Sequence, residues 1–76
     1  ITIIYEHEVK GLQEALTDIQ HKYEEIINSS MHIHIDKENC LEIIAVTGKI
    51  KAIKNLTQEL IKQRGVKQLK LSTVTF

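Results

Sequence analysis

Two histidines near the middle of the chain have the residue type and spacing needed to bind a metal ion. His32 and His34 lie two positions apart in the run Met31-His32-Ile33-His34-Ile35-Asp36, which alternates apolar and polar residues as a strand does. On a strand both imidazoles leave the same face, with Cα atoms about 6.6 Å apart, so both could reach one ion. The pair therefore forms half of a possible metal site.

Cys40 could supply a third ligand. Lys37-Glu38-Asn39 predicts a three-residue hairpin turn, which places Asp36 opposite Cys40 and puts the thiol on the face of the two histidines. Two imidazoles and a thiolate suit Ni²⁺, Cu²⁺ or Zn²⁺, whereas Mg²⁺ and Ca²⁺ prefer oxygen ligands. A register shift of one residue would instead send Cys40 into the core as a small apolar side chain. The histidines by themselves could also be ordinary exposed strand residues.

The elements that would position these side chains follow from the apolar pattern. The sequence predicts a strand over 1–6, an amphipathic helix from Val9 to Ile27 ended by Asn28-Ser29-Ser30, and the hairpin strands 31–36 and 40–46. A second helical stripe begins at Ile50 and ends at Arg64-Gly65, and residues 66–76 return to extended character. The predicted order is βαββαβ.

This order is typical of the ferredoxin-like α+β fold, a four-stranded antiparallel sheet with both helices on one face. We expect the helices to cover Met31, Ile33 and Ile35. The uncovered face would then carry His32, His34, Cys40, Glu42, Ile44 and Val46. A soluble monomer would not leave Ile44 and Val46 open on a flat sheet, so we expect an oligomer.

Two further histidines lie outside the hairpin. His21 is about 200° around the helix from Ile19 and faces outward, and we expect the sheet to separate it from His32 of its own chain. As a ligand it would then serve another chain, although spacing alone favours a solvated helix histidine. His7, between Glu6 and Glu8, could belong to a secondary site but carries little weight.

Composition limits the function classes. Seventy-six residues make one domain, and the single cysteine excludes an internal disulfide or a CxxC motif. Ten basic and ten acidic residues cancel, so the domain lacks the positive excess that holds nucleic acid. Residues 1–42 carry three basic and nine acidic residues and residues 43–76 seven and one, which indicates either two solvated faces of opposite sign or complementary halves of neighbouring chains.

Targeting and catalytic signals are also missing from the sequence. No apolar run is long enough for a membrane span and the first residues lack the order of a signal peptide, which predicts a cytoplasmic protein without a membrane partner. The sequence offers no nucleophile triad and no glycine-rich phosphate loop, which favours a binding domain over an enzyme. Because the chain begins at Ile1, we expect a fragment or a processed piece.

The spacing of these residues resembles that of a known family. His21, ten residues, Met31-His32-Ile33-His34, five residues and Cys40-Leu41-Glu42 follow one another, with Tyr5-Glu6-His7-Glu8 before and Arg64-Gly65-Val66-Lys67 after them. Over essentially the whole chain, this resembles the C-terminal regulatory domain of NikR-type nickel-responsive transcription regulators.

The resemblance implies an ACT-like fold, a tetramer, and a square-planar Ni(II) site. His32, His34 and Cys40 of one chain would be joined there by His21 of a neighbour. It also implies that three further side chains orient the ligands: Tyr5, Gln20 and Glu42.

The resemblance also concerns what lies outside residues 1–76. Family members carry an N-terminal ribbon-helix-helix domain, so DNA binding would belong to that domain and not to this segment. The family often has consecutive histidines where this chain has His21-Lys22-Tyr23-Glu24, so an additional site there is not expected. The alternative function is that of an ACT-type domain that binds a small molecule such as an amino acid.

Overall fold

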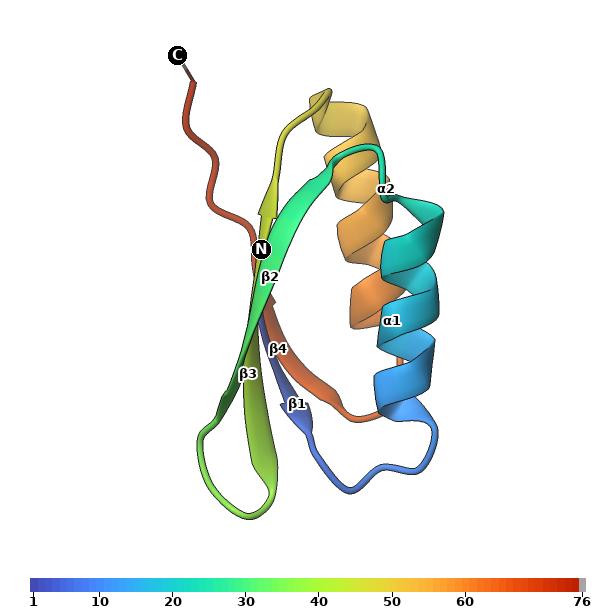
Figure 1. Cartoon of the computed structure of the whole chain (residues 1–76), viewed down its shortest axis with the longest axis vertical. Helices are drawn as coiled ribbons and strands as arrows, with labels where there is room; N and C mark the ends of the chain where they lie inside the picture. Colours follow the sequence, from blue (N-terminus) through green and yellow to red (C-terminus); the bar gives the residue numbers. More distant parts are fainter. Residues whose placement is uncertain (76) are drawn as a thin grey trace.

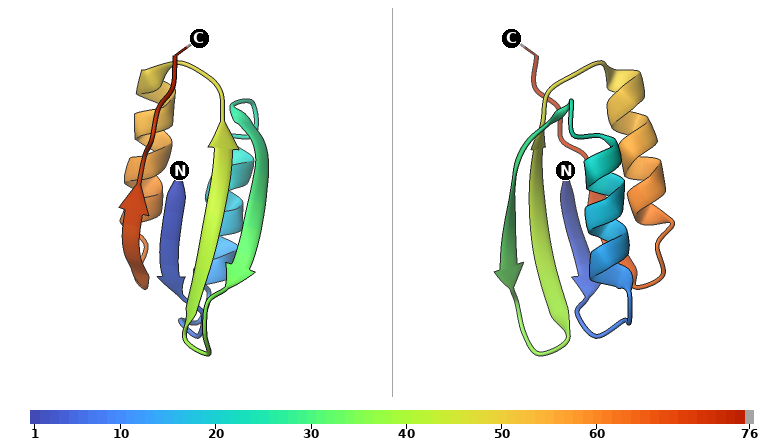
Figure 2. Two further views of the ribbon diagram at one scale, coloured as in Figure 1. Left: turned by 90° about the vertical axis from the view of Figure 1, so that its left-hand side faces the viewer. Right: turned by 45° about the vertical axis from the view of Figure 1, so that its right-hand side comes forward.

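Four strands and two helices alternate in the expected order. The computed structural model describes residues 1–75, with β1 (Thr2–Glu6), α1 (Leu12–Lys22), β2 (Ile27–His34), β3 (Asn39–Val46), α2 (Ile50–Ile61) and β4 (Val66–Lys70). The strands form one antiparallel sheet in the order β2-β3-β1-β4. Both helices lie on the same side of this sheet (Figures 1 and 2), so the ferredoxin-like α+β prediction is confirmed.

The core lies between the helices and the two central strands. β1, β3 and the two helices contribute apolar stripes, which recur every second residue in β1 and every third or fourth residue in the helices. The fully buried side chains are Ile3, Tyr5, Leu16, Cys40, Ile44, Leu56 and Leu60. Burial of this stripe against the sheet holds both helices in place.

The first helix is shorter than predicted. α1 ends at Lys22, and the chain turns so that the Ile26 N–H donates to the Tyr23 carbonyl at 3.0 Å. Ile27 then pairs with Val46, and residues 28–30 continue as strand β2 instead of ending the helix. The apolar residues Tyr23, Ile26 and Ile27 continue the helical spacing by coincidence, but pairing with β3 draws the chain into β2 from Ile27 onward.

The hairpin register differs from the predicted one by two residues. Cys40 lies opposite His34, not Asp36, because residues 35–38 form a longer loop. Asp36 stabilises this loop by accepting hydrogen bonds from the N–H groups of Glu38 and Asn39, both at 2.8 Å. A shift of two residues keeps every side chain on its face, so Cys40 still shares a face with His34.

The prediction of which face the helices cover was wrong. The helices cover the face that carries Cys40, Glu42 and Ile44, whereas Met31 and Ile33 are exposed on the opposite face. Alternation separates two faces of a hairpin, but both faces of this hairpin carry apolar residues. Strand β1 determines which face the helices cover, because its buried side chains lie beside the even-numbered residues of β3.

The C-terminal segment is extended as predicted, but its strand is short. β4 ends at Lys70, and Phe76 lies outside the described residues. Neither helix has the length and apolar character needed to cross a membrane.

Gly65 and Gly11 allow a matched test of the packing between α1 and β4. Both have positive φ, 103° and 79°, which an L-residue adopts at a cost of about 1–2 kcal/mol. A Cβ at Gly65 would also lie 2.8 Å from Leu12 and 2.9 Å from Val9, whereas a Cβ at Gly11 would meet nothing within 4 Å. We therefore expect Gly65→Ala to destabilise the domain by about 2–4 kcal/mol and Gly11→Ala by about 1–2 kcal/mol. Urea denaturation at one protein concentration measures both, and equal losses would contradict the packing argument.

Candidate metal centre

Strand pairing brings Cys40 and His34 together. The two residues are direct partners across β2 and β3, with 3.8 Å between Cys40 Sγ and His34 Nδ1. Cys40 is fully buried, while His34 is exposed at the end of β2. The thiol thus lies in the core beneath the helices, and the imidazole lies beside it at the surface.

His7 joins this pair, although from its place between Glu6 and Glu8 we expected at most a secondary site. It follows β1, and its N–H donates to the Glu38 carbonyl at 2.6 Å, which ties the loop after β1 to the hairpin loop. His7 Nδ1 lies 3.4 Å from Cys40 Sγ, and its ring meets that of His34 edge-on at 4.9 Å between centroids. The ligand atoms of His7, His34 and Cys40 all lie within 4.8 Å of one another. The sequence did contain a signal for this position. Because β1 and β3 are antiparallel, the residues that follow β1 lie near the start of β3, where Cys40 is.

His32 lies one step along β2 from His34 but has a different partner. Its Nε2 is hydrogen-bonded to the hydroxyl of Tyr5, which is buried on β1. Burial, reinforced by the nearby Cys40 and Glu42, raises the pKa of Tyr5 well above its usual value. The phenol therefore keeps its proton and can donate it to Nε2 of His32 in the tautomer that leaves this nitrogen unprotonated.

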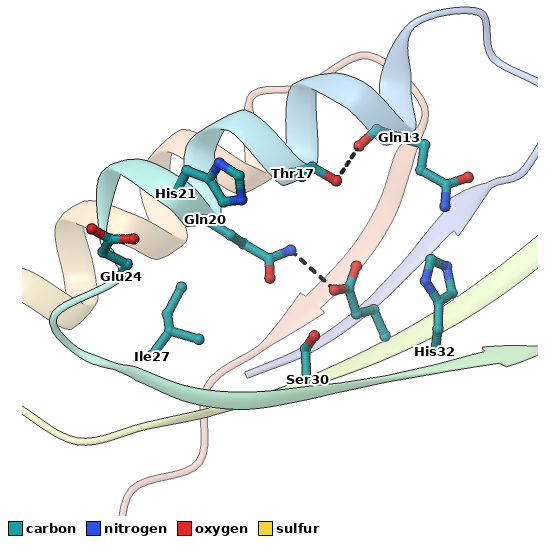
Figure 3. Close-up of a pocket in the computed structure, with 9 residues that line it drawn as sticks. Gln13, Thr17, Gln20, His21, Glu24, Ile27, Ser30 and His32 are labelled. Atoms are coloured by element: carbon teal, nitrogen blue, oxygen red, sulfur yellow. Dashed lines mark hydrogen bonds between the residues drawn. The ribbon is translucent and has the colours of Figure 1, made fainter.

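Glu42 is the one buried acidic side chain among the described residues, and it is held by α1. It lies opposite His32 in the sheet, and Gln20 Nε2 donates to its Oε2 at 3.0 Å (Figure 3). A buried carboxylate without a hydrogen bond would be costly, so this contact fixes both the carboxylate and the amide. The residues expected to orient the ligands, Tyr5, Gln20 and Glu42, thus line the same side of the sheet as the histidines.

His21 is on that side too, which corrects its predicted place. The sheet does not separate it from His32, because the helices cover the face that carries His32. The two histidines line one cavity of about 370 Å³ between α1 and β2, with Gln20 between them in Figure 3. His21 is exposed as expected and does not take part in the cluster of His7, His34 and Cys40.

The donors present fit a late first-row metal ion. Imidazole nitrogens and a thiolate select such ions over Mg²⁺ or Ca²⁺, and each donor comes from a strand end or loop that backbone hydrogen bonds hold in place. Loss of the thiol proton on binding would couple affinity to pH.

Comparison with known proteins agrees with this chemistry. Residues 1–74 match the sequence model of a family described as the NikR C terminal nickel binding domain. The chain belongs to this family. Neither the family description nor the names of the relatives below describes an enzyme, in agreement with the predicted binding domain.

Curated relatives named "Putative nickel-responsive regulator" match almost the whole chain. Identity is 45% to the protein of Methanothrix thermoacetophila over 99% of this chain and 54% of that protein. Identity to the protein of Methanococcoides burtonii is 49%, over 96% of this chain and 52% of that protein. Identity to the protein of Dictyoglomus thermophilum is 47%, over 95% of this chain and 53% of that protein. The chain therefore spans about half the length of these relatives.

The contact between Gln20 and Glu42 can be tested without metal. Gln20→Ala leaves a carboxylate that is 6% exposed without its amide partner, so we expect a loss of about 1–3 kcal/mol in the free energy of unfolding. Gln58→Ala, on the exposed side of α2, is the matched control and should change stability by less than about 0.5 kcal/mol. Chemical denaturation of the metal-free protein measures the free energy of unfolding of both variants. Equal losses in Gln20→Ala and Gln58→Ala would show that the contact is not stabilising.

Proposed function

We propose that this chain is the nickel-sensing domain of a transcription regulator and that it binds Ni(II) between chains. The observation that carries the proposal is the packing of His34 and Cys40 on the helix side of the sheet, one step from His32, in a member of a nickel-binding family. The family match favours nickel over the alternative of an amino acid ligand, although the polar cavity beside α1 would suit either a ligand or a neighbouring chain.

The proposed ligands are His32, His34 and Cys40 of one chain and His21 of a neighbour. His21 is exposed and lies outside its own chain's cluster of donors, so it is free to reach another chain. Tyr5 would hold the His32 ring until metal replaces or redirects this hydrogen bond, and the Gln20–Glu42 pair would hold the β3 strand and α1 at a fixed spacing.

An ion held between chains would act as a switch. It adds bonds that exist only in one arrangement of the chains, and a ligand shifts an equilibrium by its differential affinity for two states. The relatives are about twice as long as this chain, which leaves room for an attached DNA-binding domain of ribbon-helix-helix type. Nickel would then favour the arrangement of these domains that fits DNA.

The bare sheet face supplies a second contact between chains. Met31 lies opposite Ile43, and Ile33 lies opposite Leu41, so four apolar side chains from β2 and β3 form one uncharged patch on that face. Such a patch is complementary to itself under a two-fold axis. This contact and the nickel contact use opposite faces of the domain, and two different two-fold contacts together generate a tetramer.

Mixed chains test whether His21 serves a neighbour. His21→Ala and His32→Ala should each lose the sulfur-to-nickel charge-transfer band near one equivalent of Ni²⁺, because every site lacks one ligand. Mixed under conditions that allow subunit exchange, they should regain part of the band, since an intact His21 meets an intact set of His32, His34 and Cys40.

Cys40→Ala is the control for the band, which must vanish because no sulfur ligand is left. If exchange is shown independently and the mixture stays without the band, then His21 does not bridge chains.

Charge on the bare sheet face should break the metal-free assembly. Ile43→Lys places an ammonium group in the centre of the apolar patch, so we expect sedimentation to show smaller species at micromolar concentration. Val74→Lys is the control, because Val74 is 94% exposed and lies in the C-terminal segment. Unchanged sedimentation of Ile43→Lys would show that the patch is not an interface.

A further inference from the structure

We propose that Glu59 of α2 is a positioning residue for His21, because its carboxylate holds the last turn of α1 in place. Lys22 Nζ donates to Glu59 Oε1 at 2.8 Å, and the Tyr23 hydroxyl donates to Oε2 of the same carboxylate. These two donors directly follow His21 in the chain. The inference rests on the proposed bridging role of His21 and adds the residue that keeps His21 oriented toward a neighbouring chain.

Apolar packing holds the first half of α1 more firmly than the second half. Leu12 and Leu16 are buried, whereas Ile19 is only partly covered and His21 and Lys22 are exposed. α1 has 11 residues, fewer than the about 12–15 that an isolated helix needs to be stable in water. Helix ends also fray more easily than helix interiors. The last turn, which carries His21, therefore depends on contacts other than apolar burial.

Polar contacts hold this turn from two sides. Before His21, Gln20 donates to Glu42 and ties α1 to the sheet. After His21, Tyr23 donates to Glu59 and ties the end of α1 to α2. The exposed imidazole of His21 thus lies between two residues whose side chains are each held by a buried or half-buried carboxylate.

Glu59 is a firm anchor for this purpose. It comes three residues after Leu56 and directly before Leu60, which are both fully buried, so the backbone of α2 is fixed at this point. Its own carbonyl accepts a hydrogen bond from Gln63 Nε2 at 3.2 Å. α1 and α2 lie side by side on the sheet (Figure 2), so the carboxylate reaches the end of α1 without a loop between them.

The effect of these contacts should lie in orientation and not in overall stability. The side chains of Lys22 and Glu59 are 65% and 31% exposed, and ion pairs this exposed stabilise a fold only slightly. Two donors from consecutive residues on the two oxygens of one carboxylate nevertheless restrict how the turn can rotate. The apparent affinity of a site falls with the fraction of chains in the binding-competent arrangement, so a loosened turn would weaken nickel binding.

Hydrogen exchange of the metal-free protein tests the first step. Glu59→Gln replaces one acceptor oxygen with an amide group that only donates, so one of the two donors loses its partner. We expect the backbone amides of Tyr23 and Glu24, which close the last turn, to exchange at least about threefold faster. The amide of Ala15, in the first turn of α1, should be unchanged. Equal acceleration at both ends of α1, or none at its last turn, would overturn the positioning role.

Mixed chains test whether Glu59 acts through His21. In a mixture of His21→Ala and His32→Ala chains, the rebuilt site takes His21 from the His32→Ala chain and its other ligands from the His21→Ala chain. Glu59→Gln placed in the His32→Ala chain should raise the Ni²⁺ concentration that restores the charge-transfer band by about three- to tenfold. The same substitution in the His21→Ala chain should change nothing. The band should keep its wavelength at saturation, because no ligand is altered.

Glu25→Gln in the His32→Ala chain is the matched control, because it removes the same charge from an exposed residue two positions after Tyr23. It should leave the titration unchanged. Weakening by Glu59→Gln in both chains equally, or in neither, would overturn the role of Glu59 and leave bridging by His21 standing. A parent mixture that never regains the band, with subunit exchange shown independently, would instead refute bridging itself and the positioning role with it.

Discussion

β3 pairs with β2 on one side and with β1 on the other, and the two registers meet at Cys40. Its direct partners are His34 and Tyr5, so the thiol has an imidazole on one flank and a buried phenol on the other. The next residue on the same face, Glu42, lies opposite His32 and meets Gln20 from α1. Strand pairing around this one position thus places His32, His34 and Tyr5 beside Cys40 and Glu42.

Burial of polar groups at this place limits the number of arrangements that are stable. Tyr5 and Glu42 are almost fully buried, and each needs a hydrogen-bond partner to offset its loss of water. Tyr5 is hydrogen-bonded to His32, and Glu42 accepts a hydrogen bond from Gln20. Apolar packing tolerates small shifts between the elements, whereas these hydrogen bonds do not. These two contacts consequently hold His32 and Glu42 in place in the metal-free chain.

The sequence predicted the element order, the hairpin and the shared face of His34 and Cys40, because these depend on local periodicity. It could not show which face the helices cover, since Met31 and Ile33 on one face are as apolar as Ile44 and Val46 on the other. That choice depends on β1, whose buried Ile3 and Tyr5 are distant in sequence. The misplacement of His21 followed from the same choice. His7 was undervalued because only the contact between its loop and the hairpin loop brings it to Cys40.

In the proposed assembly, the symmetry of the nickel contact has a consequence for cooperativity. If His21 of one chain completes the site of a second, a two-fold axis makes His21 of the second complete the site of the first, so each contact holds two ions. The first ion brings both chains into the right orientation, and the second then binds to a site that is already assembled. The sheet contact adds to this effect by keeping chains paired without metal.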